Sequence, residues 1–240
     1  NLKESQLERR NRSALKKLSN LLGDVSLHMI TLYDFGNSGA AYRARIALNL
    51  KELDYKQIPV HLTKDGGQQF DADYTELNPQ NFVPTLIDSD IQLVQSMAIM
   101  EYLEEVYPDP TILPGDANDR AQIRALANIV ACDIHPINNL RVRLYLADEM
   151  EVTPENQKIW IEHWIRVGFM AYEKFYDKGP QGKFSYGDAP TIADACLIPQ
   201  IANARRNGCD LSDFTILLKI EQICQALQAF EKALPANQPG

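Results

Sequence analysis

A serine stands at residue 38, in a polar bend between two segments of contrasting pattern. The preceding residues ITLYDF have the composition of a short strand, and the following residues repeat alanine and leucine at helical spacing. A helix that begins just after a strand presents free backbone N–H groups and the positive end of its dipole. Gly39 lets a ligand approach the backbone, and the Ser38 hydroxyl can donate to a thiolate, a carboxylate or a phosphate. The same serine is equally suited to act only as the helix N-cap, and the local pattern leaves both interpretations open.

A second candidate anion site lies at Ser96. The residues VQSMAI place Ser96 at the start of a predicted helix, as its expected N-cap, directly after a strand that ends in Gln95. Between the two sites, Val83 precedes Pro84 next to a predicted strand. This bond is a candidate cis peptide bond that would expose the Val83 backbone to an extended peptide. The pattern indicates a peptide-like ligand with two anionic groups.

These candidate residues are positioned by alternating predicted strands and helices. A strand in ITLYDF, a helix over residues 40–48 and a strand in KQIPVHL form a βαβ unit. The segments PTLID and IQLVQ flank the turn at Ser89 and Asp90 as a hairpin, and the helix MAIMEYLEEVY comes next. The predicted order is therefore β-α-β, then β-β-α.

Helical patterns take over after a proline-rich connection. The stretch YPDPTILPGD carries three prolines, which suits an extended link. Beyond it we find no strand pattern, and helices are predicted after Thr153 and from the capping-box sequence TIAD. We predict an α/β domain over residues 29–107, a linker over 108–116 and an all-helical domain over 117–240.

Residues 1–28 differ in charge from the rest of the chain, with a formal charge of +3 against −11 for residues 29–240. The stretch SALKKLSNLL has amphipathic helical spacing but lacks the continuous apolar region of a secretory signal. We interpret residues 1–28 as an appended N-terminal extension, of the kind that an expression tag adds.

The composition argues against nucleic-acid and membrane partners. The formal net charge is −8, and the 24 Lys and Arg residues form no stripe that could hold a phosphate backbone. No apolar run approaches the roughly 20 residues that span a bilayer. The four cysteines lack CxxC spacing and the density of a disulfide scaffold. We expect a cytoplasmic protein.

From Met29 onward, the chain resembles a glutathione transferase. The resemblance rests on the element order, the Val-Pro pair before a hairpin, the Gln-Ser pair at a helix start and the helical second half. The motif SGAAYRARIAL resembles the serine motif of the zeta class, and CDIHPINN is most similar to the maleylpyruvate isomerase branch of that class. The resemblance implies a thioredoxin-like domain that binds glutathione, a helical domain that holds the co-substrate, and a homodimer.

The resemblance also implies roles for individual residues. Ser38 would stabilise the glutathione thiolate, and Val83 with Pro84 would pair with the cysteinyl backbone of glutathione. The other implied residues are Gln95 and Ser96 for the γ-glutamyl end, His135 and Asn139 for closing over glutathione, and Arg141 and Arg206 for the carboxylates of a diacid substrate. A guanidinium group suits that last task because it binds a carboxylate through two parallel hydrogen bonds.

Two of these residues also have a purely structural interpretation. A lone histidine beside a mid-helix proline is ordinarily part of a core, and Arg205 with Arg206 can form a solvated face. Asp133 and Asn138 crowd the same turn as His135. Because buried polar groups need partners, this crowding argues against a plain core histidine and indicates that these groups pair with one another or with a ligand.

Two positions depart from the zeta-class pattern. Asn37 stands where the pattern has an arginine, and Gly39 with Ala40 stand where it often has a second serine and a cysteine or hydroxyl residue. Losing one charge-assisted hydrogen bond costs about 1.5–3 kcal/mol, which is enough to change substrate preference.

The reaction implied by the resemblance is a glutathione-dependent cis–trans isomerisation of maleylpyruvate or maleylacetoacetate in the breakdown of aromatic compounds. The thiolate adds, a single bond rotates and the thiolate leaves, so no metal is needed. Two alternatives stay open: a general glutathione transferase that conjugates electrophiles, and a non-catalytic partner-binding protein of the same fold. Asn37 and Ala40 keep the second alternative open.

Overall fold

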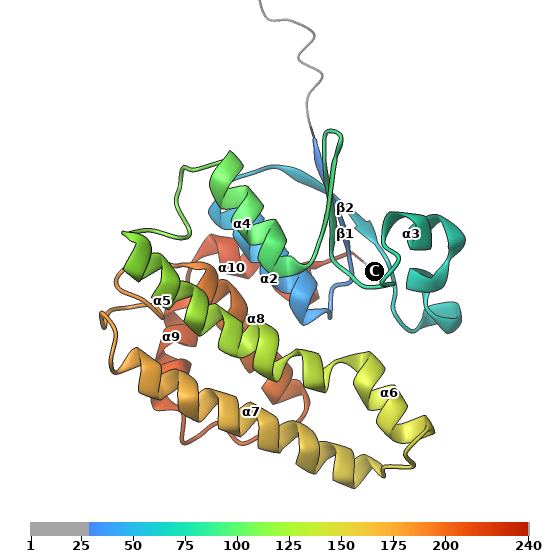
Figure 1. Cartoon of the computed structure of the whole chain (residues 1–240). Helices are drawn as coiled ribbons and strands as arrows, with labels where there is room; N and C mark the ends of the chain where they lie inside the picture. Colours follow the sequence, from blue (N-terminus) through green and yellow to red (C-terminus); the bar gives the residue numbers. More distant parts are fainter. Residues whose placement is uncertain (1–28, 240) are drawn as a thin grey trace, which may run out of the picture.

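A four-stranded mixed sheet lies at one end of the molecule and helices form the rest (Figure 1). The computed structural model describes residues 29–239, so the extension predicted over residues 1–28 lies outside the described residues. The strand order is β2-β1-β3-β4, with β1 parallel to β2 and the other pairs antiparallel. The strands are β1 (Ile30–Asp34), β2 (Tyr55–Pro59), β3 (Thr85–Asp88) and β4 (Ile91–Val94). This confirms the predicted thioredoxin-like order.

Both faces of the sheet are covered. On one face, Ile30 and Leu32 of β1 join the main hydrophobic core with helices α2 (Gly39–Leu50) and α4 (Ser96–Val106). On the other face, Tyr33 packs into a smaller cluster with Tyr74 of helix α3 (Ala72–Leu77), and Figure 1 shows α3 on the opposite side from α2 and α4. Between the C-terminal end of β1 and the N-terminus of α2, the chain forms only the short bend that carries Ser38.

The second half of the described chain contains helices and no strand, as predicted. The Thr153 side chain accepts a hydrogen bond from Asn156 N, and Thr191 with Asp194 forms the predicted capping box. Helix α8 is buried from Ile192 to Ile201 and runs through the centre of this half (Figure 1). The helices are α5 (Ala117–Asn128), a π-helical turn (Ile129–Ile134), α6 (Leu140–Asp148), α7 (Pro154–Tyr176), α8 (Ile192–Arg206), α9 (Thr215–Gln225) and α10 (Gln228–Ala233).

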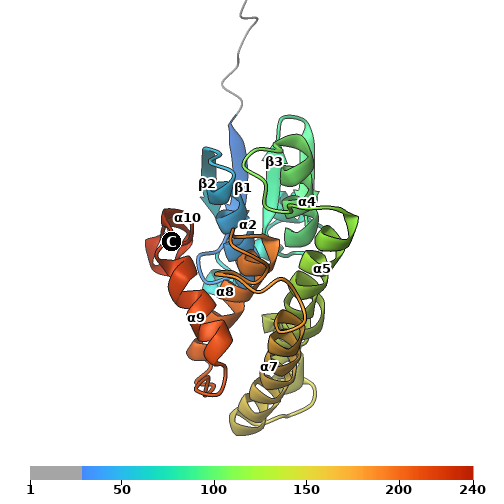
Figure 2. The ribbon, with the colours of Figure 1, turned by 90° about the vertical axis from the view of Figure 1, so that its left-hand side faces the viewer.

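The two halves of the chain share one core. Ile112 and Leu113, within the predicted linker 108–116, are buried in it. Helix α10 returns to pack against α2, where Asn49 Nδ2 donates to Ala229 O at 2.8 Å (Figure 2). Helix α2 is therefore surrounded by both halves of the chain.

Strand β2 is shorter than its predicted pattern KQIPVHL. It ends at Pro59, and the Val60 N–H donates to Asp34 O at 2.6 Å. The His61 N–H then donates to the side chain of Gln68 at 2.8 Å, so the chain leaves the sheet early. Within residues 29–239, no helix has the length and apolarity needed to cross a membrane.

Candidate functional site

Ser38 lies at the N-terminus of α2, directly after β1. Its Oγ accepts a hydrogen bond from Ala41 N at 3.3 Å, so the predicted N-cap is confirmed. Its own N–H donates to Phe35 O at 2.8 Å, which closes the bend. The hydroxyl proton is not used in the capping contact, because the oxygen acts there as acceptor. Ser38 can therefore cap the helix and still donate to an anion.

The Val83–Pro84 segment is held next to β3 by side chains from the α3 region. The Val83–Pro84 peptide bond is cis, as predicted, and both residues are buried. The Phe82 carbonyl accepts hydrogen bonds from Tyr74 Oη at 2.5 Å and from Asn78 Nδ2 at 2.8 Å. These contacts fix the backbone that the resemblance assigns to the peptide part of glutathione.

The prediction that Ser96 caps α4 is wrong. Ser96 is the first residue of α4, and Gln95 occupies the N-cap position with a φ of 72° and no side-chain cap. Strand β4 ends at Val94, and Gln95 Nε2 donates to Gln80 Oε1 at 2.7 Å. Ser96 is buried, and its Oγ accepts from Arg43 Nη1 at 3.4 Å. Ser96 binds a side chain of α2 rather than its own helix backbone.

His135, from the second half of the chain, lies against the start of α2. A Cβ atom added to Gly39 would lie 3.3 Å from His135 Cε1 and 3.4 Å from Nδ1, so the glycine allows this close approach. Burial, followed by the positive charges of Arg43 and Arg206, lowers the pKa of His135 to about 3. The imidazole is therefore neutral near pH 7, and one nitrogen can donate while the other accepts.

Helix α6 begins directly after the CDIHPINN motif and contacts Phe82, next to Val83. Asn139 is its N-cap, because Asn139 Oδ1 accepts from Arg141 N at 3.2 Å. The guanidinium carbon of Arg141 lies 4.7 Å from the centroid of the Phe82 ring, a cation–π contact. Asn138 is buried, and neither its side-chain oxygen nor its nitrogen has a partner in the described part of the chain.

Arg206, in the last turn of α8, reaches the bend before α2. Its Nη1 donates to Asn37 O and to Asn37 Oδ1, both at 3.3 Å. The adjacent Arg205 points elsewhere and pairs with Glu221, with Nη2 at 2.5 Å from Oε2. The two arginines therefore have different environments, and of the two only Arg206 contacts the bend before α2.

Two further arginines lie near these residues and were not identified from the sequence. Arg43 of α2 is only 2% exposed. Arg143 is in α6. Burial is the main cause that lowers the pKa of Arg206, and the positive charge of Arg143 is the second. Arg43 follows Gly39 by four residues, so the helical period places both on one face of α2, and this spacing could have drawn attention to Arg43.

The structure joins most of the predicted residues into two connected groups. One group is centred on the bend at residues 37–39, and the other joins Arg141 to the Val83 segment through Phe82. Gln95 instead bonds to Gln80, outside both groups. The first group comprises Ser38, His135 and Arg206, with Ser96 linked through Arg43.

The first group is rich in donors and positive charge. Neither Arg43 nor Arg206 forms an ion pair with a carboxylate among the described residues. Helix N-terminal N–H groups, hydroxyls and guanidinium groups together stabilise a thiolate or a carboxylate. Within residues 29–239, no cluster of three or more His, Cys, Asp or Glu is suited to a metal ion.

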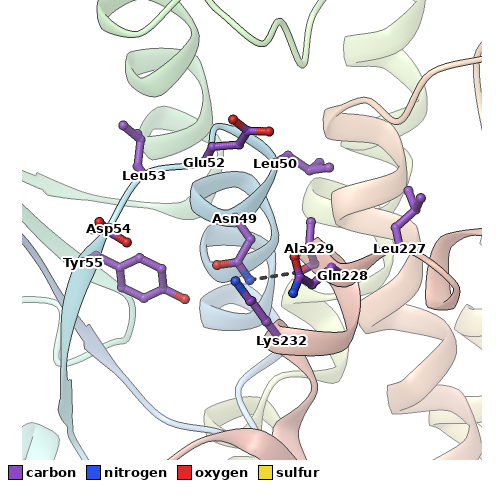
Figure 3. Close-up of a pocket in the computed structure, with 10 residues that line it drawn as sticks. All are labelled: Asn49, Leu50, Glu52, Leu53, Asp54, Tyr55, Leu227, Gln228, Ala229 and Lys232. Atoms are coloured by element: carbon purple, nitrogen blue, oxygen red, sulfur yellow. Dashed lines mark hydrogen bonds between the residues drawn. The ribbon is translucent and has the colours of Figure 1, made fainter.

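A groove of about 520 Å³ lies away from this group, at the opposite end of α2 (Figure 3). The hydrogen bond between Asn49 and Ala229 crosses it and ties α10 to α2. Its polar lining comes mainly from surface residues, so we assign it no role in the chemistry. The lining residues are Asn49, Leu50, Glu52, Leu53, Asp54, Tyr55, Leu227, Gln228, Ala229 and Lys232.

Comparisons with known proteins identify the family of this chain. Residues 28–105 match the family described as "Glutathione S-transferase, N-terminal domain". A probable maleylacetoacetate isomerase from Vibrio cholerae is 43% identical over 210 residues, which are 88% of this chain and 97% of the relative. A maleylpyruvate isomerase from a Ralstonia species is 44% identical over 209 residues, which are 87% of this chain and 98% of the relative.

Solved structures give the same result. A zeta-class maleylpyruvate isomerase in holo form superposes with a TM-score of 0.84 at 44% identity, covering 87% of this chain and 98% of that one. A maleylacetoacetate isomerase from Methylobacterium extorquens, with bound malonate and glutathione, has a TM-score of 0.83 at 36% identity, covering 88% and 98%. This chain belongs to the glutathione transferase family, within the zeta-class branch of maleylacetoacetate and maleylpyruvate isomerases.

Proposed function

We propose that this chain catalyses the glutathione-dependent cis–trans isomerisation of a conjugated diacid, maleylpyruvate or maleylacetoacetate. The observation that carries the proposal is the contact of His135 and Arg206, from the second half of the chain, with the bend that bears Ser38. The contacts are with Gly39 and Asn37, the two neighbours of Ser38 in the chain, and they support a role for His135 and Arg206 toward an anionic substrate near the Ser38 hydroxyl.

The residues present fit glutathione as the cofactor. Both polar side-chain atoms of buried Asn138, in the motif between His135 and Asn139, lack a partner in the described part of the chain. In the proposal, Val83 with Pro84 holds the cysteinyl backbone. Gln95 and Ser96 hold the γ-glutamyl end, and His135 and Asn139 close over the tripeptide. The bound glutathione in the Methylobacterium extorquens enzyme supports this proposal.

Bound glutathione supplies a thiolate that adds reversibly to a conjugated double bond. Ser38 Oγ donates to the sulfur and favours its ionised form, as do the free N–H groups of α2. Arg141 and Arg206 bind the carboxylates of the diacid. Arg206, at 3.3 Å from two oxygens of Asn37, also stabilises the negative charge that develops on the substrate beside the bend.

The proposal includes a homodimer, which the family resemblance implies, in the cytoplasm, which the cysteine pattern predicts. Sedimentation equilibrium of the purified chain tests the dimer, with twice the chain mass of 27.1 kDa as the expected result. A monomer at micromolar concentration would remove the dimer from the proposal without affecting the chemistry.

The direct test is to follow the absorbance of maleylpyruvate and of maleylacetoacetate with and without glutathione. We expect turnover of at least one diacid only when glutathione is present. Ser38→Ala should lower kcat by about 10²–10³, by analogy with the loss of one donor to a developing anion. The matched control Ser38→Thr keeps the hydroxyl and should retain most of the turnover.

The same assays separate the alternative functions. Turnover of an electrophilic aryl halide without turnover of either diacid would indicate a general transferase. Glutathione binding without any turnover would indicate a binding protein. Ser38→Ala with unchanged kcat would remove Ser38 from its proposed role.

A further inference from the structure

Arg43 is a buried cation with an incomplete set of partners. Its side chain lies inside the molecule at 2% exposure, and its only hydrogen bond in the described structure is from Nη1 to Ser96 Oγ at 3.4 Å. Its Nε is buried without a partner among residues 29–239. Burial lowers the pKa of Arg43, which is the expected effect of placing a charge in a medium of low polarity. A buried charge in this state is costly unless a counter-charge is brought to it.

No carboxylate among the described residues forms an ion pair with Arg43. His135 approaches Gly39, which lies one helical turn before Arg43 on the same face of α2. Burial and the neighbouring arginines keep this imidazole neutral near pH 7. Burial also raises the pKa of the Cys196 thiol to about 11, so that neighbour is neutral as well. The charge of Arg43 is therefore left for a group that the described chain does not contain.

The contact between Arg43 and Ser96 determines how the serine can act. A hydroxyl has one proton to donate and two lone pairs that accept. Because Arg43 donates to Ser96 Oγ, the serine uses a lone pair in this contact and keeps its own proton for another acceptor. Ser96 also opens α4, where free backbone N–H groups favour an anion. The Ser96 hydroxyl can therefore donate to an anionic acceptor, and the nearby positive charge of Arg43 favours that anion.

We propose that Arg43 is a positioning residue of the glutathione site, which orients Ser96 Oγ as a donor to the γ-glutamyl carboxylate and provides the buried charge that this carboxylate balances. The inference rests on the proposed binding of glutathione. Arg43 does not touch the ligand, because its guanidinium is enclosed by protein; it acts through Ser96 and through its charge.

Calorimetric titration of the purified protein with glutathione tests this role. Arg43→Met should weaken glutathione binding tenfold or more, whereas Arg43→Lys, which keeps the charge, should restore part of the affinity. Ser96→Ala combined with Arg43→Met should weaken binding little more than either change alone, since both remove one interaction. Arg205→Met removes a positive charge that Glu221 already balances and is the matched control, with unchanged affinity expected.

A ligand that lacks the recognised group separates this role from a general loss of structure. The tripeptide 4-aminobutyryl-cysteinyl-glycine has no γ-glutamyl carboxylate, so wild type and Arg43→Met should bind it equally. Equal weakening of both ligands by Arg43→Met, or glutathione affinity within twofold of wild type, would overturn the inference. If Arg43→Met does not fold, Arg43→Lys provides the test. Weaker binding of glutathione with unchanged binding of the 4-aminobutyryl tripeptide supports the inference. Glutathione affinity equal to that of wild type overturns it.

The ligand-free protein provides an independent measurement. Because the charge of Arg43 contributes to the low pKa of His135, the His135 pKa should rise in Arg43→Met when the imidazole is followed by NMR. An unchanged His135 pKa contradicts the inference. Wild-type protein that fails to bind glutathione at all would instead refute the proposed function, so the two failures are distinguishable.

Discussion

Two buried arginines stand two residues apart on helix α2, and their surroundings differ. Arg45 is completely buried and has a full set of internal partners, because it donates to both carboxylate oxygens of Asp34 at 2.6 and 2.8 Å, to Gly36 O at 2.9 Å and to Ala233 O at 3.1 Å. Within the described residues, Arg43 has one hydrogen bond, to Ser96, and no carboxylate. The difference separates a cation whose charge is balanced within the fold from one whose charge no carboxylate of the described residues balances.

Helix α8 repeats this contrast at its C-terminal end. Arg205 pairs with Glu221, whereas the hydrogen bonds of its neighbour Arg206 go to neutral oxygens of Asn37. Arg43 and Arg206, which form no ion pair with a carboxylate among the described residues, both contribute to lowering the pKa of His135. In both helices, the arginine without a carboxylate partner among the described residues is the one that the proposals place in the glutathione and diacid site.

The largest effect that tests this comparison is expected at Arg45. Arg45→Met leaves the Asp34 carboxylate buried without its main partner, so the free energy of unfolding should fall by about 3–5 kcal/mol. Urea denaturation followed by circular dichroism measures the change. Adding Asp34→Asn should recover part of the loss, and a loss below about 1 kcal/mol in the single variant would contradict a structural role.

A smaller effect, on the reaction rather than on stability, is expected at Arg206. Losing one charge-assisted hydrogen bond of about 1.5–3 kcal/mol should raise the KM for the diacid roughly 10-fold to 150-fold in Arg206→Ala. The glutathione affinity should stay close to that of wild type. Arg205→Ala is the matched control and should leave the KM unchanged; steady-state kinetics that show the same KM increase in both variants would refute the assignment.

Burial and the charges of Arg43 and Arg206 also make the stability of the protein depend on pH, through His135. The pKa of His135 is lowered to about 3 in the folded protein, below the value of about 6.5 for a free histidine. The unfolded chain therefore takes up this proton first, and the stability from neutral His135 is present above about pH 6.5 and lost as the pH falls toward 3. His135→Asn should move the acid unfolding midpoint to lower pH, whereas the exposed control His163→Asn should not.

The smallest change in stability is expected at Arg43. Removing a buried charge that has no counter-ion relieves a desolvation cost, so Arg43→Met should change the free energy of unfolding by no more than about 1 kcal/mol or should increase it. The urea experiment used for Arg45→Met measures it. A loss as large as that of Arg45→Met would abolish the distinction between the two arginines.

Local patterns in the sequence predicted much of the fold. The N-caps Ser38, Thr153 and Thr191 are confirmed because capping depends on residues only three positions apart. The predicted capping role of Ser96 is wrong because Gln95 occupies the N-cap position and Ser96 is the first helical residue. Its hydroxyl instead accepts from Arg43, a residue 53 positions away that no local pattern can include.

The candidate site was predictable in its residue types but not in its connections. The contacts of His135 with Gly39 and of Arg206 with Asn37 agree with the clustering that the family resemblance implied. The roles of these residues toward glutathione and the diacid stay predictions. Arg43 and Arg143 were missed because the helical pattern around an arginine does not show whether a carboxylate from a distant segment will pair with it.

The sequence by itself determined the order of strands and helices and placed a serine where a strand opens into a helix, because periodicity and capping act over a few residues. Only the tertiary structure decided which arginines are neutralised. Asp34, Gly36 and Ala233 converge on Arg45, whereas Arg43 bonds to Ser96. The physical reason is that a buried charge is balanced by whatever groups long-range packing brings within hydrogen-bond distance, and in the described part of the chain packing brought none with a negative charge to Arg43.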